Sequence, residues 1–253
     1  MSYKQKKAFF DNMLTIYGRK AVEEALLDTQ LPVYKLHLAD SNRPHAIIDH
    51  CLELARQRGI EIAWHDRRKL SFISKNARQD QGIALDIALK NLKDINQLAP
   101  ETDRNLLLLD NITNPQNIGM IIRNVAAGFI DGVIIPRKGC AELGPLVIKA
   151  SSGSLFKATI YRCDDSAQAL DCLKPNYQLA ALMLDNTSQN LYQYPFNQPT
   201  VFVLGNESTG VSSKVANACN KRLYIPMNNQ VESLNVAVTS ALLAFHPMLL
   251  NPV

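Results

Sequence analysis

The chain lacks the residue patterns that mark disulfide-bonded, metal-binding and membrane-spanning proteins. Its five cysteines are scattered and odd in number, without a CxxC pair, so we expect reduced thiols and no structural metal. The five histidines form no HExxH or other metal-ligand pair. No apolar run approaches the roughly 20 residues of a membrane span, and the Lys-rich start reaches Asp11 without the apolar segment of a secretory signal. We therefore expect a cytoplasmic protein with no membrane or metal partner.

Excess positive charge is missing from the second half of the chain. Residues 1–100 carry 16 Lys and Arg against 12 Asp and Glu, whereas residues 101–253 carry 11 of each. The basic residues of the first half form three clusters, which suit phosphate contacts but are also typical of an ordinary solvated surface. These clusters are Lys4, Lys6 and Lys7, then Arg19 and Lys20, then Arg67, Arg68 and Lys69.

The pattern of residues 1–95 predicts a small α/β domain. Apolar residues recur at helical spacing three times, and β-rich runs separate the three helices. The helices are expected over 17–28, from a Ser41 or Asn42 cap to Gly59, and from an Asp66 cap to Ile73, and the strands over 33–38, 60–64 and 83–88. Residues 96–104 are polar, contain a proline and lose the apolar periodicity, so they are the expected linker.

Beyond residue 104, strands and helices alternate more regularly. Residues 106–109 form an uninterrupted apolar run, typical of a strand that is buried on both faces of a parallel sheet. Further strands are expected over 132–136, 157–161, 178–184, 200–204 and 222–226, and helices over 116–128, 165–173, 211–219 and 232–246. Such alternation predicts a second domain, residues 105–253, built on a parallel doubly wound sheet.

Ligands of a doubly wound sheet bind beyond the carboxyl ends of its strands, where three loops of this chain are rich in polar residues. The first loop, residues 110–119, leads into a helix that carries Arg123. Asn117 and Gly119 at the helix start, together with the planar guanidinium of Arg123, form a candidate anion site. The open alternative is an Asn/Pro turn that only caps the helix.

The second loop, residues 205–210, contains two glycines five apart, as in half of a nucleotide-binding P-loop. It lacks the lysine of that motif, and Glu207 within it would repel a polyphosphate, which disfavours a nucleotide hydrolase. A backbone-lined pocket for a neutral or cationic ligand fits better. The alternative is a plain turn between a strand and a helix.

The third loop, residues 225–236, joins a strand end to the start of the last helix. Backbone groups around Ile225 and Met227 could hold the edge of an adenine ring, with Leu234 packed on its face. Ser233 and Asn235 lie two apart at the helix start, where both can point into a site. The alternative is that a polar residue of this loop only caps the helix.

Together, the three loops resemble the motifs of the SpoU-type, TrmH-like RNA methyltransferases of the SPOUT superfamily. The matches are Asn117, Gly119 and Arg123 to N-x-G-x-x-x-R, residues 204–210 to L-G-N-E-x-x-G, residues 225–227 to I-P-M, residues 233–236 to S-L-N-V, and residues 150–156 to A-S-x-G-x-x-F. Residues 105–250 carry most of this resemblance. Residues 16–26 and 80–84 resemble the ribosomal-protein-like substrate domain of many members.

The chain departs from the family pattern at three places. Gly128 and Phe129 stand where the family often has Phe-Gly, which should shift only the end of the helix. Asp80 stands where relatives commonly have histidine. Asn229 stands in place of a loop glycine, and asparagine tolerates a positive φ better than other residues with side chains, so the loop is expected to survive.

The resemblance implies a fold and an activity. The fold is a C-terminal SPOUT parallel-sheet domain with a deep trefoil knot, preceded by a small α/β ribosomal-protein-like domain that binds the RNA substrate. The activity is transfer of a methyl group from S-adenosylmethionine to a ribose 2′-hydroxyl of RNA. We expect rRNA before tRNA, because the two-domain layout resembles rRNA-modifying members. The alternative is a catalytically silent RNA-binding protein on the same fold.

The resemblance also assigns the site residues. Arg123 is the residue that the family places nearest the hydroxyl, and because arginine stays protonated we expect it to clamp a phosphate and stabilise the developing alkoxide rather than act as a base. The expected catalytic residues are Arg123, Asn117, Glu207, Ser233 and Asn235. The expected cofactor contacts are Leu204, Gly205, Asn206, Gly210, Ile225, Met227, Ser233, Leu234 and Asn235. The expected RNA contacts are Arg19, Lys20, Arg67, Arg68 and Arg123.

A homodimer is expected as well. The predicted helix over 232–246 is apolar on nearly every face, and one face of a sheet can cover only one side of it. A partner subunit would cover the other side and give a two-fold dimer whose active sites are completed across the interface. The alternative cover is the C-terminal tail of the same chain.

Overall fold

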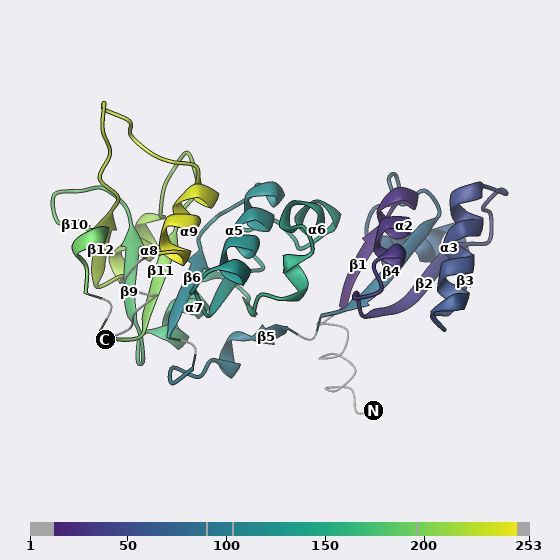
Figure 1. Ribbon diagram of the computed structural model, residues 1–253, viewed down its shortest axis with the longest axis horizontal. Helices are drawn as coiled ribbons and strands as arrows, with labels where there is room; N and C mark the ends of the chain where they lie inside the picture. Colours follow the sequence, from purple (N-terminus) through teal and green to yellow (C-terminus); the bar gives the residue numbers. More distant parts are fainter. Residues whose placement is uncertain (1–12, 90, 103, 196, 247–253) are drawn as a thin grey trace. The chain divides into compact units, whose positions relative to one another are not determined.

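The computed structural model describes residues 13–246 except 90, 103 and 196, and it divides into two compact units, Met1–Lys90 and Asn91–Val253 (Figure 1). The basic cluster at Lys4, Lys6 and Lys7 and the C-terminal tail lie outside the described residues. No helix within the described part of the chain is long and apolar enough to cross a membrane.

Among its described residues, the first unit contains a four-stranded sheet and three helices. In chain order these are β1 (Met13–Tyr17), α2 (Arg19–Leu27), β2 (Val33–Ala39), α3 (Ala46–Gln57), β3 (Glu61–His65), α4 (Arg67–Ser74) and β4 (Ile83–Ala88). The sheet order is β1-β4-β2-β3, in which β2 and β3 are parallel and the other neighbours antiparallel. Strand β1 was not expected from the sequence. Strand β1 is followed by Gly18, whose φ of +89° lets the chain turn directly into α2.

Helix α3 begins later than predicted, and neither Ser41 nor Asn42 caps it. Its N-cap is His45, whose ring accepts a hydrogen bond from the backbone N–H of Ile47 at 3.2 Å. Pro44 explains the difference, because a proline disfavours helical backbone at the residue before it. The Asn42 amide instead donates to the Gly82 carbonyl at 2.8 Å. The predicted Asp66 cap of α4 is confirmed, since its carboxylate accepts from the Lys69 N–H at 2.8 Å.

The second unit is an eight-stranded sheet in which all described neighbours are parallel, as predicted. Its strands are β5 (Leu92–Asp94), β6 (Asn105–Leu109), β7 (Gly132–Pro136), β8 (Ile160–Cys163), β9 (Gln178–Leu182), β10 (Gln189–Asn190), β11 (Thr200–Leu204) and β12 (Lys221–Tyr224), in the order β10-β12-β9-β11-β6-β7-β8-β5. Residues 92–94, which the sequence placed in the first domain, pair with β8 at the edge of this sheet. The trefoil knot remains a prediction.

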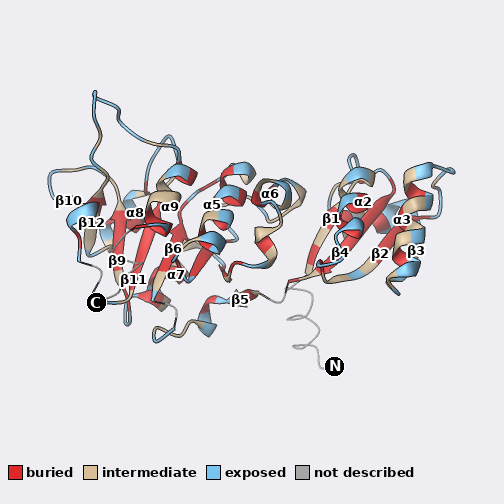
Figure 2. Ribbon diagram, in the orientation of Figure 1, coloured by how far each residue is buried: buried red, intermediate tan, exposed pale blue. Residues whose placement is uncertain are grey.

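Helices cover both faces of this sheet, and its strands β7, β8 and β11 are buried along their whole length (Figure 2). They are α5 (Pro115–Ala127), α6 (Pro145–Ser151), α7 (Ser166–Leu173), α8 (Ser213–Ala218) and α9 (Val236–Ala244). Leu106 and Leu108 of β6 share a core with α7 and α8, while Leu107 and Leu109 alternate to the opposite face. Helix α6 was not predicted, and α9 begins four residues later than expected.

Helix α5 packs closely against α9. The Asn124 amide donates to the Ala237 carbonyl at 2.8 Å and to the Ser240 hydroxyl at 2.9 Å. A Cβ added to Gly128, the C-cap of α5, would lie 2.4 Å from the Ala244 carbonyl oxygen. Gly128 therefore ends α5 where it meets the last residue of α9.

Candidate active site

Residues from all three loops meet at one buried amide. Asn117 lies in the first turns of α5 and is 5% exposed. Its Nδ2 donates to Oε1 of Glu207, in the loop after β11, and its Oδ1 accepts from Nδ2 of Asn235 at 3.2 Å. The Asn117 side chain thus links the three loops, and its partner Asn235 lies 118 positions away in the sequence.

Asn235 also settles how the third loop ends. Its Oδ1 accepts from the Ala237 N–H at 2.8 Å, so Asn235 is the N-cap of α9 and Ser233 is not. The stretch 231–235 has no regular secondary structure and leaves Ser233 exposed. Asn229 has a φ of +55°, in the left-handed region that asparagine tolerates better than other residues with side chains.

The second loop folds back on itself, and its two glycines make this possible. Asn206 and Gly210 form a two-way backbone bridge, with N···O distances of 3.0 and 2.8 Å. A Cβ on Gly205 would lie 2.1 Å from the Gly210 carbonyl carbon, and Gly210 has a φ of +67°. The side chain of Asn206 accepts from the N–H groups of Ser208 and Thr209. The loop therefore presents backbone to a ligand.

Asp110 fixes this loop to the first one. It is 2% exposed, at the carboxyl end of β6. Its carboxylate accepts from the Ser212 N–H at 2.8 Å, from the Ser166 hydroxyl at 3.0 Å and from the Asn111 amide at 3.1 Å. Asn206 adds a bond from its amide to the Asn111 carbonyl at 3.0 Å.

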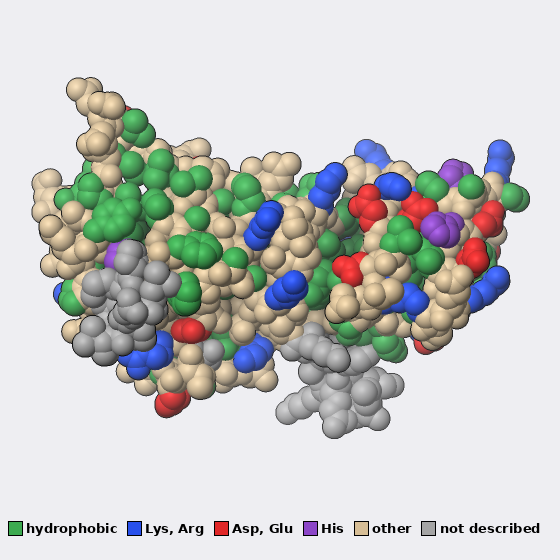
Figure 3. Space-filling model, in the orientation of Figure 1, with side chains coloured by type: hydrophobic (Ala, Val, Ile, Leu, Met, Phe, Trp, Pro, Cys, Tyr) green, Lys and Arg blue, Asp and Glu red, His purple; other side chains and the backbone are tan. Residues whose placement is uncertain are grey.

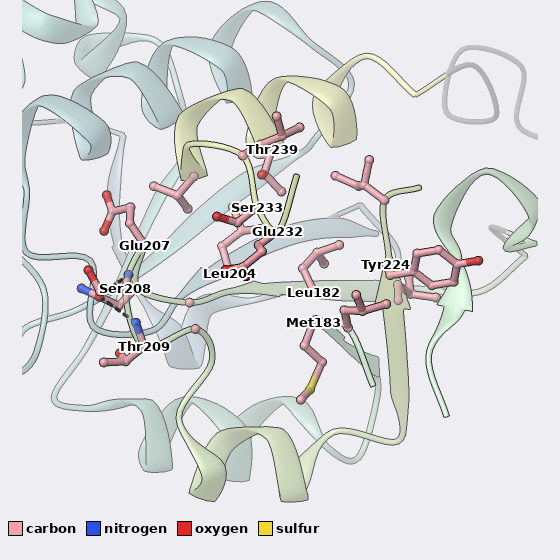
Figure 4. A pocket seen from close by; sticks show the side chains of 18 of the residues that line it. Leu182, Met183, Leu204, Glu207, Ser208, Thr209, Tyr224, Glu232, Ser233 and Thr239 are labelled. Atoms are coloured by element: carbon pink, nitrogen blue, oxygen red, sulfur yellow. Dashed lines mark hydrogen bonds between the residues drawn. The ribbon is translucent and has the colours of Figure 1, made fainter. Parts of the chain in front are cut away.

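A pocket of about 460 Å³ opens between the ends of β9, β11 and β12 and the start of α9 (Figure 4). Most of the predicted cofactor contacts line it, namely Leu204, Gly205, Asn206, Gly210, Ile225, Met227, Ser233 and Leu234. Asn235 does not line it. Among the lining side chains of the described residues, only Glu207 and Glu232 are charged. The acidic lining disfavours a polyphosphate and suits a ligand that carries positive charge.

The predicted catalytic residues fall into two groups. Glu207 and Ser233 line the pocket, and Asn117 and Asn235 connect to it through Glu207. Arg123 does not line it, because it lies exposed on α5, where its Nη1 donates to the Ser152 hydroxyl at 3.3 Å.

Gly119, which the sequence placed at a candidate anion site, has a packing role in the structure. A Cβ there would lie 2.5 Å from Cβ of Ala150 and 2.7 Å from the Val147 carbonyl oxygen in α6. The missing side chain therefore allows α6 to approach α5.

Sequence reasoning missed part of the pocket wall. Leu182, Met183 and Leu184, at the end of β9, line it beside Thr239 of α9. The available signal was that β9 is a buried parallel strand, whose carboxyl end belongs to the same edge of the sheet as the motif loops.

Comparison with known proteins identifies this arrangement. Residues 104–245 match the SpoU rRNA Methylase family, and residues 15–92 match the family described as RNA 2′-O ribose methyltransferase substrate binding. The chain belongs to the SpoU rRNA methylase family. It is an S-adenosylmethionine-dependent RNA 2′-O-ribose methyltransferase, and a catalytically silent RNA-binding protein is not favoured.

Individual relatives agree with this family over nearly the whole chain. The 23S rRNA (guanosine-2′-O-)-methyltransferase RlmB of Acinetobacter baylyi is 32% identical over 89% of this chain and 93% of its own. A putative TrmH family tRNA/rRNA methyltransferase of Staphylococcus aureus is 29% identical over 91% and 93%. The AdoMet-bound SpoU methyltransferase AviRb of Streptomyces viridochromogenes shares the fold, with a TM-score of 0.63, 21% identity and coverage of 95% and 90%.

The pocket of this SpoU family member fits S-adenosylmethionine. Backbone at the ends of β11 and β12 would hold the adenine, and Leu234 would pack on its face. The carboxylates of Glu207 and Glu232 provide the negative potential that a sulfonium cation requires. Gly205 keeps the wall free of a side chain at the point where the loop crosses itself.

The substrate-binding unit of the enzyme contains a basic pocket of about 570 Å³. Its lining residues are Arg19, Lys20, His45, Ile47, Arg67, Arg78 and Gln81. Helices α2, α3 and α4 each contribute residues from their N-terminal ends, where the helix dipole attracts anions. Three predicted RNA contacts, Arg19, Lys20 and Arg67, thus line one pocket, but Arg68 does not.

Two details shape this basic pocket. The Arg19 guanidinium donates from Nε to the Gln81 carbonyl at 3.2 Å, whereas Lys20 is paired with Glu23 at 3.0 Å. Asp80 next to Gln81 is 1% exposed, and its carboxylate accepts from the Gly82 N–H and the Ser74 hydroxyl. The aspartate that replaces the family's histidine therefore stabilises the loop after α4.

The thiols of the enzyme are unsuited to nucleophilic catalysis. All five cysteines are free, and burial raises the pKa of each thiol, to about 12 for Cys163 and about 11 for Cys219. Within residues 13–246, no group of three or more His, Cys, Asp or Glu side chains is placed to hold a metal ion.

Proposed function

We propose that this enzyme methylates the 2′-hydroxyl of one ribosomal RNA nucleotide. The observation that carries the proposal is the Asn117–Glu207–Asn235 cluster beside a pocket with two acidic side chains. The name of the Acinetobacter relative, a 23S rRNA methyltransferase, favours rRNA over tRNA. The cytoplasmic location stays a prediction.

The cluster of Asn117, Glu207 and Asn235 would position the reacting groups. S-adenosylmethionine supplies an electrophilic methyl group when it is bound. Asn117 fixes Glu207 at the pocket wall, and the Ser233 hydroxyl lies on the same wall. Arg123 is exposed and free to contact an RNA phosphate, where its charge would stabilise an oxygen that becomes more negative. Positioning of the hydroxyl would provide much of the rate.

The substrate-binding unit would hold the RNA through its basic pocket. Reversing charge at Arg19 or Arg67 should weaken RNA binding and reduce its dependence on salt, because each phosphate contact releases a counterion. Arg56→Glu is the matched control, since Arg56 is an exposed residue at the last turn of α3 and does not line the pocket. If RNA affinity and its salt dependence change equally in the Arg19, Arg67 and Arg56 variants, the RNA does not bind at the basic pocket.

A two-fold homodimer would complete the active site. Helix α9 leaves apolar side chains on the surface, with Val238 48% and Phe245 46% exposed, and hydrophobic side chains gather over it in Figure 3. Met120 of α5 is 39% exposed as well. In the proposed dimer, Arg123 of one protomer would contribute to the active site of the other.

Two experiments test the proposal. Ribose methylation mapped across total RNA from a strain without this gene should lack one rRNA site, which the wild-type gene should restore. Mixing Arg123→Ala with Asn235→Ala chains should recover activity that neither variant has alone. If sedimentation shows a monomer that is fully active, the active site is not shared between two subunits. If the deletion strain lacks a ribose methylation in tRNA and none in rRNA, the substrate is tRNA.

A further inference from the structure

The outer face of α4 carries an exposed aromatic ring that basic residues flank in the sequence. Phe72 is 73% exposed. Arg68 lies four positions before it, which puts both side chains on one face of the helix, and Lys75, the left-handed C-cap of α4, follows Phe72 by three positions. The opposite face is anchored by Leu70, which is fully buried with Ala84 of β4. The ring is therefore held in solvent by a helix that cannot easily turn it inward.

The charge around this ring is of one sign. Arg68, Lys69 and Lys75 are exposed, and none forms an ion pair among the described residues. The neighbouring carboxylates have other partners, because Asp66 caps α4 and Asp80 is buried in the following loop. We call Arg68, Phe72 and Lys75 the α4 stripe.

We propose that the α4 stripe binds unpaired nucleotides of the RNA substrate, with one base stacked on Phe72 and the flanking phosphates on Arg68 and Lys75. Aromatic rings between cations are the usual means of binding single strands, because every base has a face that stacks and every phosphate a charge. An apolar protein partner would instead require a contiguous apolar patch. The exposed neighbours of Phe72 on this helix face are cationic.

This inference rests on the proposed RNA function and adds to it the kind of RNA that is bound. Arg67 lines the basic pocket, and Phe72 follows it by five residues on the same helix. That separation is a rise of about 7.5 Å along the helix axis. The two side chains also project about 140° apart around the helix axis, so a strand with one phosphate in the pocket would pass part of the way round α4 to present a base to Phe72.

The test uses the full chain and two fluorescein-labelled probes, a single-stranded U12 RNA and a blunt 12-base-pair RNA duplex. Fluorescence anisotropy should show that Phe72→Ala and Phe72→Leu each weaken U12 binding by about tenfold, whereas Phe72→Tyr stays within about twofold of wild type. Duplex binding should change by less than about twofold in all three. Leu27→Ala, which removes another exposed apolar side chain of the same unit, is the control.

The binding results decide whether an unpaired base stacks on Phe72. Full binding by Phe72→Leu would show that the ring does not stack and would overturn the inference, as would an equal loss for U12 and duplex. Arg68→Gln and Lys75→Gln should each reduce the salt slope of U12 binding by about 0.7, the value for one phosphate contact on a single strand. Arg56→Gln should leave the slope unchanged. If methyl transfer to RNA fails while these binding results hold, only the proposed function is wrong.

Discussion

Asp110 offers the sharpest test of how the cofactor loop is held. Its buried carboxylate accepts three hydrogen bonds, from Ser212, Ser166 and Asn111, and so joins β6 to the loop after β11 and to α7. A hydrogen bond to a charged group contributes roughly 1.5–3 kcal/mol. Because the three bonds share one acceptor and water can replace some of them, we expect Asp110→Ala to lower the free energy of unfolding by about 3–5 kcal/mol.

The same substitution should weaken cofactor binding. Ser212 directly follows the 205–210 loop, so losing its anchor leaves that loop to be ordered by the ligand, and we expect the Kd for S-adenosylmethionine to rise by about tenfold or more. Urea unfolding and isothermal titration measure the two effects. Asp110→Asn keeps one acceptor oxygen and should fall between wild type and Asp110→Ala.

Asp171→Ala is the matched control for Asp110, because it removes an exposed carboxylate whose nearest cation, Lys174, is 3.9 Å away. It should change neither stability nor affinity appreciably. If Asp110→Ala unfolds within about 1 kcal/mol of wild type, or binds the cofactor within about twofold, the anchoring argument is wrong.

Three further substitutions test other parts of the structure. Gly119→Ala should lower the free energy of unfolding by about 1–3 kcal/mol in thermal denaturation, because its Cβ would lie 2.5 Å from that of Ala150. Arg123→Ala should abolish methyl transfer while calorimetry shows cofactor affinity within a few fold; near-normal turnover would refute its role. Hydrogen bonds from Thr187, aided by Arg222, hold the pKa of Asp185 well below its usual range. Asp185→Asn should therefore be less stable than wild type above pH ~4, and the difference in stability should shrink progressively as the pH falls below about 4 towards the lowered folded-state pKa.

The sequence predicts elements well where the apolar pattern is long and poorly where it is short. Residues 106–109 are four consecutive leucines, and they form the buried strand β6 that their pattern indicates. Strand β5 has three residues, Leu92–Asp94, two of them charged, so its pattern resembles a linker. Its place in the sheet depends on pairing with β8, nearly 70 residues later in the chain. No local pattern contains that information.

Helix starts depend on caps that compete within a few residues. The stretch 232–235 contains Ser233, Leu234 and Asn235, which fit the first turn of a helix as well as they fit a loop. The structure resolves this through tertiary contacts, because Asn235 caps α9 and also donates to Asn117 of α5. The second contact joins residues 118 positions apart, so no local pattern reveals it.

Some pocket residues belong to motifs that are local in the sequence, whereas others are placed by the order of the strands. Motif residues that line the pocket, such as Gly205 and Ile225, could be named from the chain because their loops carry recognisable spacing. The wall at Leu182–Leu184 carries no motif, and it reaches the pocket only because β9 lies between β12 and β11 in the sheet. Strand order decides which ends are neighbours, and in a parallel sheet alternation alone leaves that order open. The loops that line a pocket at the edge of such a sheet can therefore be predicted from the sequence. Its hydrophobic wall can be predicted only when the order of the strands is known.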